Sequence, residues 1–564
     1  MPYLYNVHSS LASSVLINSA SSNSEIRRLS VNRRLTEMLN AVTKRIIRGL
    51  LFCLYCLMSP VILYRALGSR KRCSLVRNKL LLLSATDLAK KIREQQITSE
   101  EVVTAYITRC RDVNPVINAI VETRYDLAIQ EAREADKMIR LGHKSLDEIA
   151  RDTPLLGIPI TVKGSIAVQG MNHAAGRKWP EIPRALCDAD AVQRVREAGG
   201  IVLLVSNTPE LCMCWETYNN VTGMTVNPYD TRRTAGGSSG GEAALLGSAA
   251  SLLSLSSDIG GSARLPAMFC GIFGHKPTPG FVSTNGHMPG SNDKAWPNFF
   301  TLGPMVRYAE DLPLLLKAMC QSSRSKLKLD DKVPLRDIKF FYMEDDCGSG
   351  ATSSIDRDIK RAIRRLIEHL NSLQGVMVQK AELTDMKYSL EVMAAILLHI
   401  DGVESIYSKK SNPQEWKSVT VEILRYLCCM SPHTFPSILY GVLKKVNNAT
   451  PQTYFKMVEK NAAIKKQFAD LLGDNGVLIY PTFVSAAHYP YEIYHKVCNV
   501  SYLAIFNSLG LPVTQCPLGF NRNGLPIGVQ IVANPGCDHL TLSVAREIER
   551  AFGGWQQPTT GEKV

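Results

Sequence analysis

The chain has 564 residues, of which 45% are hydrophobic and 21% charged. This composition is typical of a globular protein with a sizeable core and excludes a disordered chain. The formal net charge of +14 is concentrated in residues 1–80, so the nearly neutral remainder excludes nucleic acid as an expected partner.

The N-terminal region combines a basic tail with an apolar run. Residues 1–44 are basic and rich in serine, which predicts a disordered tail. The run GLLFCLYCLMSPVILY lies between Arg48 and Arg65 and predicts a hydrophobic membrane anchor over residues 45–68. As a helix it reaches only about 24 Å, which allows a short span extended by the arginines or a one-leaflet hairpin bent at Pro60.

The cysteines indicate the compartment. The chain has fifteen cysteines, an odd number, and their spacing does not repeat. This pattern indicates reduced thiols and therefore a catalytic domain in the cytosol. Three Asn-x-Ser/Thr triplets point more weakly to a lumen. We therefore expect a protein attached to the endoplasmic reticulum or to a lipid droplet. The sequence leaves its topology and its oligomeric state open, a homodimer included.

The rest of the chain, residues 85–560, is expected to form one α/β catalytic domain. Ser84, and Thr98 with Glu101, have the spacing of helix-capping residues, which predicts that a helix follows each. A buried strand at 154–163 is expected to present Lys163 at its end. The other expected elements are helices at 124–141 and 190–198, and strands at 201–205, 340–343, 477–480, 511–520 and 524–532.

Residues 416–446 form a separate apolar stretch. Their sequence predicts two short helices on either side of a turn from Ser431 through Pro436. One interpretation is a flap that contacts lipid or admits a long acyl chain. The other is a pair of ordinary core helices, and the sequence does not decide between them.

Two glycine–serine turns, GGSSGG at 236–241 and SDIGGS at 257–262, carry the chemistry. Glycines let the backbone approach a substrate closely, and free N–H groups can stabilise a developing oxyanion. Neither turn has the Gly-Lys-Ser/Thr ending of a phosphate-binding loop. The first also lacks the buried strand that precedes a hydrolase nucleophile elbow. The only Cys-x-x-Cys, Cys53 to Cys56, lies within the apolar run and has no second pair, so we expect neither metal nor cofactor.

The second turn follows an apolar strand and suits a nucleophile. Ser262 is the candidate nucleophile, and the N–H groups from Ile259 to Ser262 are the candidate oxyanion hole. Asp258 is a possible catalytic acid, although a bracing contact with Arg264 is the favoured interpretation. Lys163 is a candidate base if it is neutral, the alternative being an ordinary solvated lysine at a strand end.

Lys163, GGSSGG, DIGGSARLPA (258–267) and GIFGHKPTPG (271–280) together resemble the amidase signature family, in particular its fatty-acid amide hydrolase branch. The resemblance runs from about residue 85 to the C-terminus and implies an α/β/α sandwich around a large mixed sheet. It further implies that Lys163 is the base and Ser262 the acyl-accepting nucleophile. Ser238, held by a cis peptide bond in this family, would carry the proton between them, and Ser239 would be structural.

The resemblance also implies an activity that needs no metal or cofactor. The expected function is membrane-associated hydrolysis of fatty-acid amides, both primary amides and N-acylethanolamines, with the oxyanion held by Ile259, Gly260, Gly261 and Ser262. The chain departs from many relatives after Lys163 and at Cys212, an expected substrate-pocket residue. The alternatives are an amidase or esterase of small amides, an amidotransferase subunit, and a lipid-amide-binding membrane protein without turnover.

Overall fold

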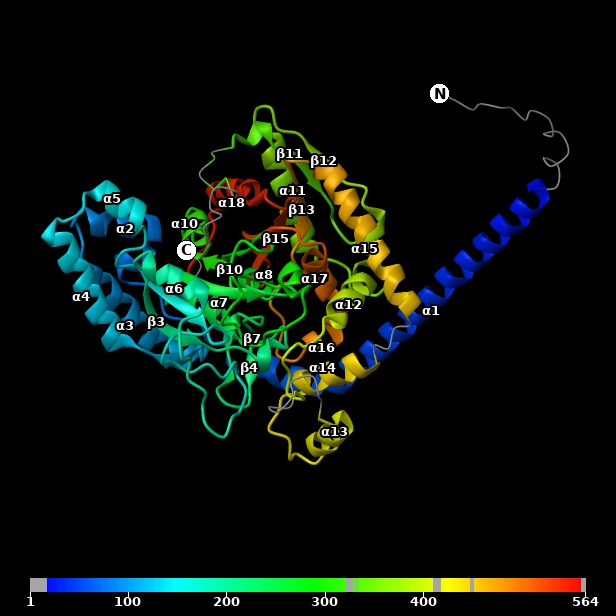
Figure 1. Ribbon diagram of the computed structural model, residues 1–564, viewed down its shortest axis with the longest axis horizontal. Helices are drawn as coiled ribbons and strands as arrows, with labels where there is room; N and C mark the ends of the chain where they lie inside the picture. Colours follow the sequence, from blue (N-terminus) through cyan, green and yellow to red (C-terminus); the bar gives the residue numbers. More distant parts are fainter. Residues whose placement is uncertain are drawn as a thin grey trace, which may run out of the picture.

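One large mixed sheet organises the body of the protein (Figure 1). The computed structural model describes residues 18–320, 328–329, 331, 333–408, 417–446 and 451–558. Within these residues, eleven strands pair in the order β1 (Ile120–Thr123), β3 (Ile201–Ser206), β2 (Pro159–Lys163), β8 (Leu253–Asp258), β10 (Thr301–Val306), β9 (Phe273–Lys276), β14 (Val513–Phe520), β15 (Pro526–Val532), β13 (Gly476–Pro481), β11 (Lys339–Tyr342) and β12 (Val378–Lys380).

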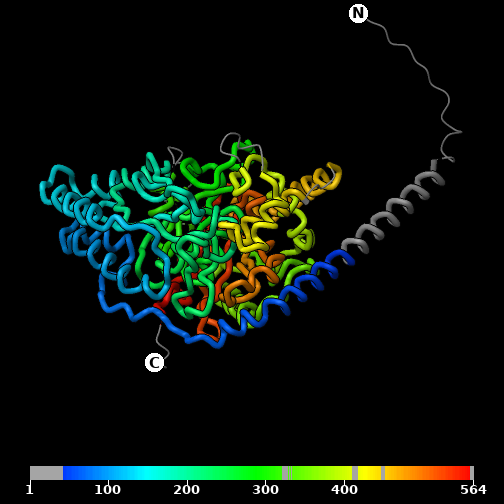
Figure 2. Tube along the Cα trace, turned by 90° about the horizontal axis from the view of Figure 1, so that it is seen from below, coloured from blue at the N-terminus to red at the C-terminus, as the bar shows by residue number. Residues whose placement is uncertain are grey.

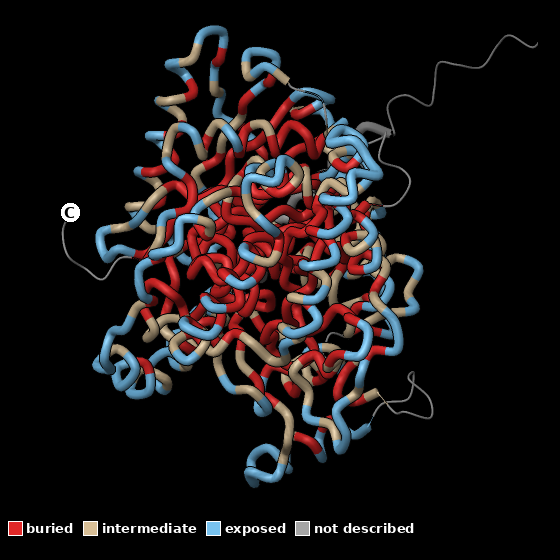
Figure 3. Tube along the Cα trace, turned by 90° about the vertical axis from the view of Figure 1, so that its left-hand side faces the viewer, coloured by how far each residue is buried: buried red, intermediate tan, exposed pale blue. Residues whose placement is uncertain are grey.

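Both faces of this sheet are covered. Strand β2 is parallel to both neighbours, β3 and β8, whereas the strands from β8 to β13 pair antiparallel. Every residue of β2, β8 and β10 is buried, and successive side chains of a strand point to opposite faces. Figure 3 shows the buried residues gathered at the centre of the molecule. The expected layered α/β architecture is confirmed.

The helices around the sheet and beside it come from the whole length of the chain. They are α2 (Ala85–Arg93), α3 (Ser99–Ile117), α4 (Tyr125–Leu141), α5 (Leu146–Asp152), α6 (Asp190–Glu197), α7 (Gly240–Gly247), α8 (Arg264–Phe269), α9 (Trp296–Phe299), α10 (Asp311–Met319), α11 (Arg357–Asn371), α12 (Ser389–His399), α13 (Val419–Leu427), α14 (Phe435–Val446), α15 (Pro451–Leu472), α16 (Ile493–Lys496), α17 (Ser501–Ser508) and α18 (Asp538–Phe552). Two short hairpins, β4 (Tyr218–Asn219) with β5 (Gly223–Met224) and β6 (Val226–Asn227) with β7 (Asp230–Thr234), precede α7.

The capping residues act as the sequence predicts. The Ser84 hydroxyl accepts a hydrogen bond from the Asp87 N–H at the start of α2, and Thr98 and Glu101 form a reciprocal capping box at α3. The strand expected at 154–163 begins only at Pro159. The residues before it form a turn instead, in which the Leu156 N–H donates to the Thr153 carbonyl.

The N-terminal region is one long helix, α1 (Asn18–Leu67). Residues 18–44, expected to be disordered, are helical because neither proline nor glycine interrupts them. Residues 1–17 of the expected tail lie outside the described residues. The helix also continues through Pro60, so the chain does not turn back there. Proline leaves the Cys56 carbonyl without its helical donor, and the Ser59 hydroxyl donates to it instead at 2.8 Å.

The apolar part of α1 lies along the catalytic body and does not stand away from it (Figures 1 and 2). Residues 42–67 are long and apolar enough to cross a membrane, and only 6% of their most apolar stretch is buried. Lys44, near one end, pairs with Glu391 at 2.7 Å. At the other end the Arg232 guanidinium donates to the Ala66 carbonyl at 2.9 Å. Both ends of the apolar segment are therefore tied to the body.

Candidate active site

Lys163 is the centre of the site. It is the last residue of β2, and its side chain is completely buried. The amine donates to the Ser238 hydroxyl at 2.7 Å and to the Ser257 hydroxyl at 2.9 Å. Burial disfavours the ammonium form and lowers the pKa of Lys163 below its usual range. The alternative of a solvated strand-end lysine is therefore wrong.

The first glycine–serine turn brings Ser238 to this amine. The Gly237–Ser238 peptide bond is cis, as the family resemblance implies. The glycines are needed because the turn packs against backbone on two sides. A Cβ at Gly237 would lie 2.7 Å from the Trp215 carbonyl carbon, and one at Gly241 would lie 2.4 Å from the Asn207 carbonyl oxygen.

The second turn is held by a buried ion pair. The Asp258 carboxylate accepts from the Arg264 guanidinium at 3.0 and 3.1 Å, and both side chains are buried. Burial alone would raise the pKa of Asp258, but Arg264 holds it well below its usual range. This is the bracing contact that the sequence favours over a catalytic acid. The Ser239 N–H donates to the Ser262 carbonyl at 3.2 Å and ties the two turns together.

The same brace corrects the expected oxyanion hole. The Gly261 N–H donates to the Asp258 carboxylate at 2.8 Å, so it is engaged within the turn. For the N–H groups of Ile259, Gly260 and Ser262, no acceptor is found among the described residues. Gly261 is still required as glycine. Its φ is +100°, and a Cβ there would lie 2.5 Å from the Leu503 side chain.

A cavity of about 230 Å³ opens from these hydroxyl groups. Ser238, Ser257 and Ser262 lie together in its wall, with Ile259, Gly260 and Cys212. The remaining lining is largely apolar, and much of it comes from α12, α14 and α16: Leu211, Met213, Cys214, Trp215, His287, Pro289, Trp296, Phe300, Leu397, Leu398, Val403, Pro436, Leu439, Tyr440, Leu443, Ile493, Tyr494 and Val497. The arrangement suits a ligand with an apolar body and one polar reacting group.

The apolar stretch at 416–446 provides part of this cavity. Residue 416 lies outside the described residues, and α13 and α14 are the two expected helices. Leu439 and Tyr440 of α14 line the cavity, while Leu424 and Leu427 of α13 are exposed.

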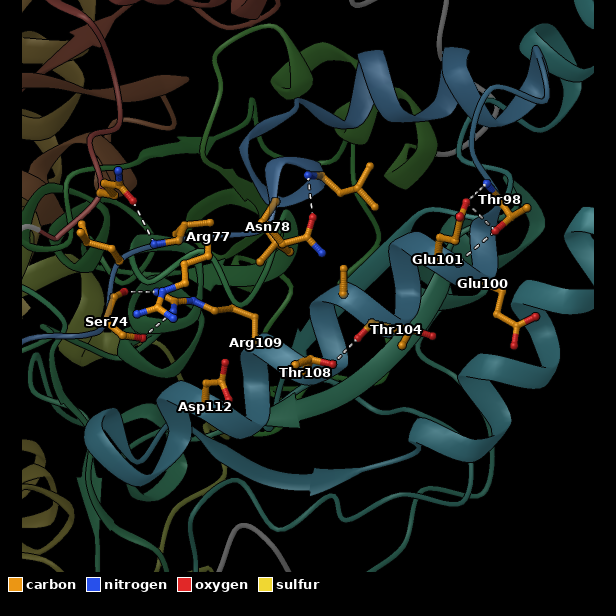
Figure 4. A pocket seen from close by; sticks show the side chains of 16 residues that line it. Ser74, Arg77, Asn78, Thr98, Glu100, Glu101, Thr104, Thr108, Arg109 and Asp112 are labelled. Carbon is orange, nitrogen blue, oxygen red and sulfur yellow. Dashed lines mark hydrogen bonds between the residues drawn. The ribbon is translucent and has the colours of Figure 1, made fainter.

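A larger depression elsewhere on the surface has about 1310 Å³ but no comparable chemistry (Figure 4). It lies between α3 and the segment 74–81. Its polar groups mostly bind one another, as Arg109 does with the Ser74 hydroxyl and carbonyl at 2.8 and 2.7 Å. None of the hydroxyl groups around Lys163 lines it, so it is not the candidate site.

Two residues of the site are not identified as functional by the sequence. Ser257 stands in the second turn without a spacing that marks it, and His287 lies on a loop 124 residues after Lys163. The His287 ring nitrogen Nε2 is 3.0 Å from the Ser257 hydroxyl oxygen. Only the folded chain brings these residues together.

Comparison with known proteins agrees with this geometry. The Amidase family profile matches residues 101–542. The chain belongs to this family. It is 41% identical to human fatty-acid amide hydrolase 2 over 493 residues, which cover 86% of this chain and 91% of that protein. It is 39% identical to fatty-acid amide hydrolase 2-A of Danio rerio over 487 residues, covering 86% and 91% of the two chains.

Solved structures share the fold. A fatty acid amide hydrolase structure superposes with a TM-score of 0.69 at 22% identity, covering 85% of this chain and 87% of that one. The peptide amidase of Stenotrophomonas maltophilia gives 0.68 at 21% identity, covering 85% and 98%. With the family match and the close relatives, this member of the amidase family is an enzyme that hydrolyses the carbon–nitrogen bond of amides.

The thiol of Cys212 is expected to influence the pH at which Lys163 becomes active. Burial lowers the pKa of Lys163, whereas negative charge at Cys212 raises it. If neutral Lys163 is the base, activity rises as the pH rises through this pKa. Replacing Cys212 by alanine removes the raising effect, so the rising limb of kcat/KM against pH should move to lower pH. Cys214→Ala, which removes another thiol of the same cavity, should leave the limb in place. A limb that stays or moves to higher pH in Cys212→Ala would contradict this role.

Proposed function

We propose that the protein is a membrane-associated serine hydrolase that cleaves the amide bond of fatty-acid amides through an acyl-enzyme on Ser262. The observation that carries the proposal is the buried Lys163 amine, 2.7 Å from the Ser238 hydroxyl at the polar end of an apolar cavity that Ser262 also lines. The fatty-acid amide hydrolase relatives support the choice of substrate class.

In the acylation step, neutral Lys163 takes the proton of the Ser238 hydroxyl as Ser238 takes that of Ser262. The Ser262 oxygen attacks the amide carbonyl, and the carbonyl oxygen gains the negative charge. The free N–H groups of Ile259, Gly260 and Ser262 are placed to stabilise that oxyanion.

The proton must then reach the leaving nitrogen, because an unprotonated amine leaves poorly. Lys163 returns the proton through Ser238 to the nitrogen as the carbon–nitrogen bond breaks. The released amine carries the proton that Ser262 gave up. Water then attacks the ester on Ser262 with the same base, which frees the fatty acid and restores the hydroxyl.

The mouth of the cavity lies beside α1, and this supports attachment to a lipid surface. Leu443 and Val497 line the cavity and are also exposed. Val497 follows α16, whose His495 packs its ring edge against Tyr55 of α1, with 4.8 Å between ring centroids. An acyl chain leaving a lipid layer would thus meet the mouth directly.

The contacts of α1 favour an anchor that lies in the plane of the lipid surface. Leu50, Phe52 and Leu57 are exposed on this helix and can insert into the boundary between lipid headgroups and acyl chains. Ion pairing at Lys44 and the bond to the Ala66 carbonyl hold both ends of the apolar segment to one body. A helix crossing the layer would have to break one of these contacts.

The nucleophile is tested by covalent labelling. A fluorophosphonate probe should label the full chain and not its Ser262→Ala variant, and Ser262→Ala should lose about a thousandfold or more in kcat/KM, or roughly 4 kcal/mol of barrier lowering. Ser256→Ala is the matched control. Ser256 lies on β8, shortly before Ser262, and its hydroxyl donates to the Gly303 carbonyl, away from Lys163. Labelling that survives in Ser262→Ala would refute the assignment.

Substrate class is tested by acyl length. In a series of primary amides, kcat/KM should continue to rise as the acyl chain is lengthened past the short acyl groups, since each buried methylene contributes about 0.8 kcal/mol. Leu443→Glu should reduce the rate for long chains more than for short ones. Leu424→Glu, on an exposed position of α13 outside the cavity, should change neither. A preference for two- to four-carbon acyl groups would instead favour a small-amide hydrolase, and binding without turnover a carrier.

Lipid attachment is tested by vesicle flotation. The full chain should float with phosphatidylcholine vesicles and remain bound at high salt. Salt screens interactions between charges but does not weaken the burial of apolar surface. Leu50→Glu with Leu57→Glu should abolish flotation. A matched pair, Leu141→Glu with Leu146→Glu at exposed positions away from α1, should not. In microsomes, protease should reach both sides of α1 from the outside; protection of one side would show a spanning helix.

A further inference from the structure

We propose that His287 is a positioning residue that directs the lone pair of Lys163 toward Ser238. It acts through the Ser257 hydroxyl. This inference rests on the proposed function, since it takes Lys163 to be the base that receives the Ser238 proton.

The hydrogen bonds of the His287 ring determine which nitrogen carries the proton. The ring is buried in the loop between β9 and β10 and packs against Phe300, with 4.6 Å between ring centroids. Its Nδ1 lies 3.0 Å from the Pro289 carbonyl oxygen. A carbonyl oxygen only accepts, so Nδ1 is the donor. In the neutral ring, Nε2 is then left as an acceptor.

This acceptor faces two hydroxyl groups. Nε2 lies 3.0 Å from the Ser257 oxygen and 3.0 Å from the Ser165 oxygen. Both serines must point their O–H toward the ring to bond with it, because Nε2 has no proton to give. The lone pairs of the Ser257 oxygen then face away from His287, toward Lys163.

The direction of the Ser257 hydroxyl decides what Lys163 can do. A neutral amine has two N–H groups and a single lone pair. In the structure the amine donates to Ser238 at 2.7 Å and to Ser257 at 2.9 Å. With one N–H held by Ser257, the neutral amine can turn its lone pair to Ser238 and accept the proton of that hydroxyl. If the Ser257 hydroxyl turned round, it would donate to the same lone pair and compete with Ser238. A chain of donors from Lys163 through Ser257 to His287 and Pro289 therefore sets the productive arrangement.

The surroundings of His287 fit this role. His173 is directed elsewhere, since its Nε2 lies 3.2 Å from the backbone carbonyl oxygen of Ser165. The Cys212 thiol also hydrogen-bonds to Lys163 and to His287. Of these two links between the amine and the ring, Ser257 is the one that carries a hydroxyl group. No carboxylate among the described residues pairs with His287 in the way that Glu210 pairs with His433. In the neutral ring that this role requires, Nδ1 donates to Pro289 and Nε2 accepts from Ser257.

The proposal is tested by a rescue series in the full chain. His287→Phe keeps a ring beside Phe300 but removes the acceptor, so kcat should fall about 10–100-fold with KM changed little. His287→Gln restores an acceptor oxygen for Ser257 and an N–H for Pro289, and it should recover most of that loss. His173→Phe, a neighbouring ring outside the relay, should stay within about twofold of the parent chain. A glutamine variant as slow as the phenylalanine variant would overturn the proposal.

A double-mutant cycle shows whether His287 acts through Ser257. Ser257→Ala should slow fluorophosphonate labelling about as much as His287→Phe, and the double variant should be no slower than Ser257→Ala. If the losses of rate in the two single variants multiply in the double variant, the proposal is overturned. Matching circular dichroism spectra would show that all variants fold. Lys163→Ala separates the two proposals. If it remains active, the proposed function fails; if it is inactive while the cycle is additive, only the role of His287 fails.

Discussion

The fully buried amine of Lys163 is the constraint on which the site depends. Its nearest hydrogen-bond partners are two hydroxyl groups, and an ammonium ion is costly to keep out of water. Burial therefore lowers the pKa of Lys163 and favours the neutral amine, the form that can accept a proton. Strand β2 is buried on both faces within the mixed sheet, so the fold keeps this amine out of contact with solvent.

The two glycine–serine turns converge on this amine because neighbouring groups, which take no part in the reaction, fix the position of each turn. The Asp258–Arg264 pair fixes the second turn and uses the Gly261 N–H to do so. The first turn is fixed by backbone that leaves no room for a Cβ at Gly237. The backbone N–H groups and hydroxyl groups of the two turns are thus held in place before any substrate arrives, which is what electrostatic stabilisation of a transition state requires.

The cavity of the catalytic body also leads toward the apolar helix α1. The cavity begins at the serine hydroxyls and ends between α14 and α16, and α16 contacts α1. Apolar side chains continue from the cavity lining to the exposed positions of α13, α14 and α1. An apolar ligand in this cavity is therefore kept out of water, which favours its binding.

The sequence by itself determined the family, the layered α/β fold, the capped helices and the candidate residues Lys163, Ser238 and Ser262. The fold, the helices, Lys163 and Ser262 follow from local patterns: glycines where the backbone is crowded, capping boxes, and strands bounded by turns. The family and Ser238 come from the resemblance of the combined motifs. Tertiary structure alone decided that the Gly261 N–H is engaged by Asp258. It alone brought Ser257 and His287 to Lys163. Such contacts depend on strand order and loop course between residues far apart in the chain, and no local spacing records them.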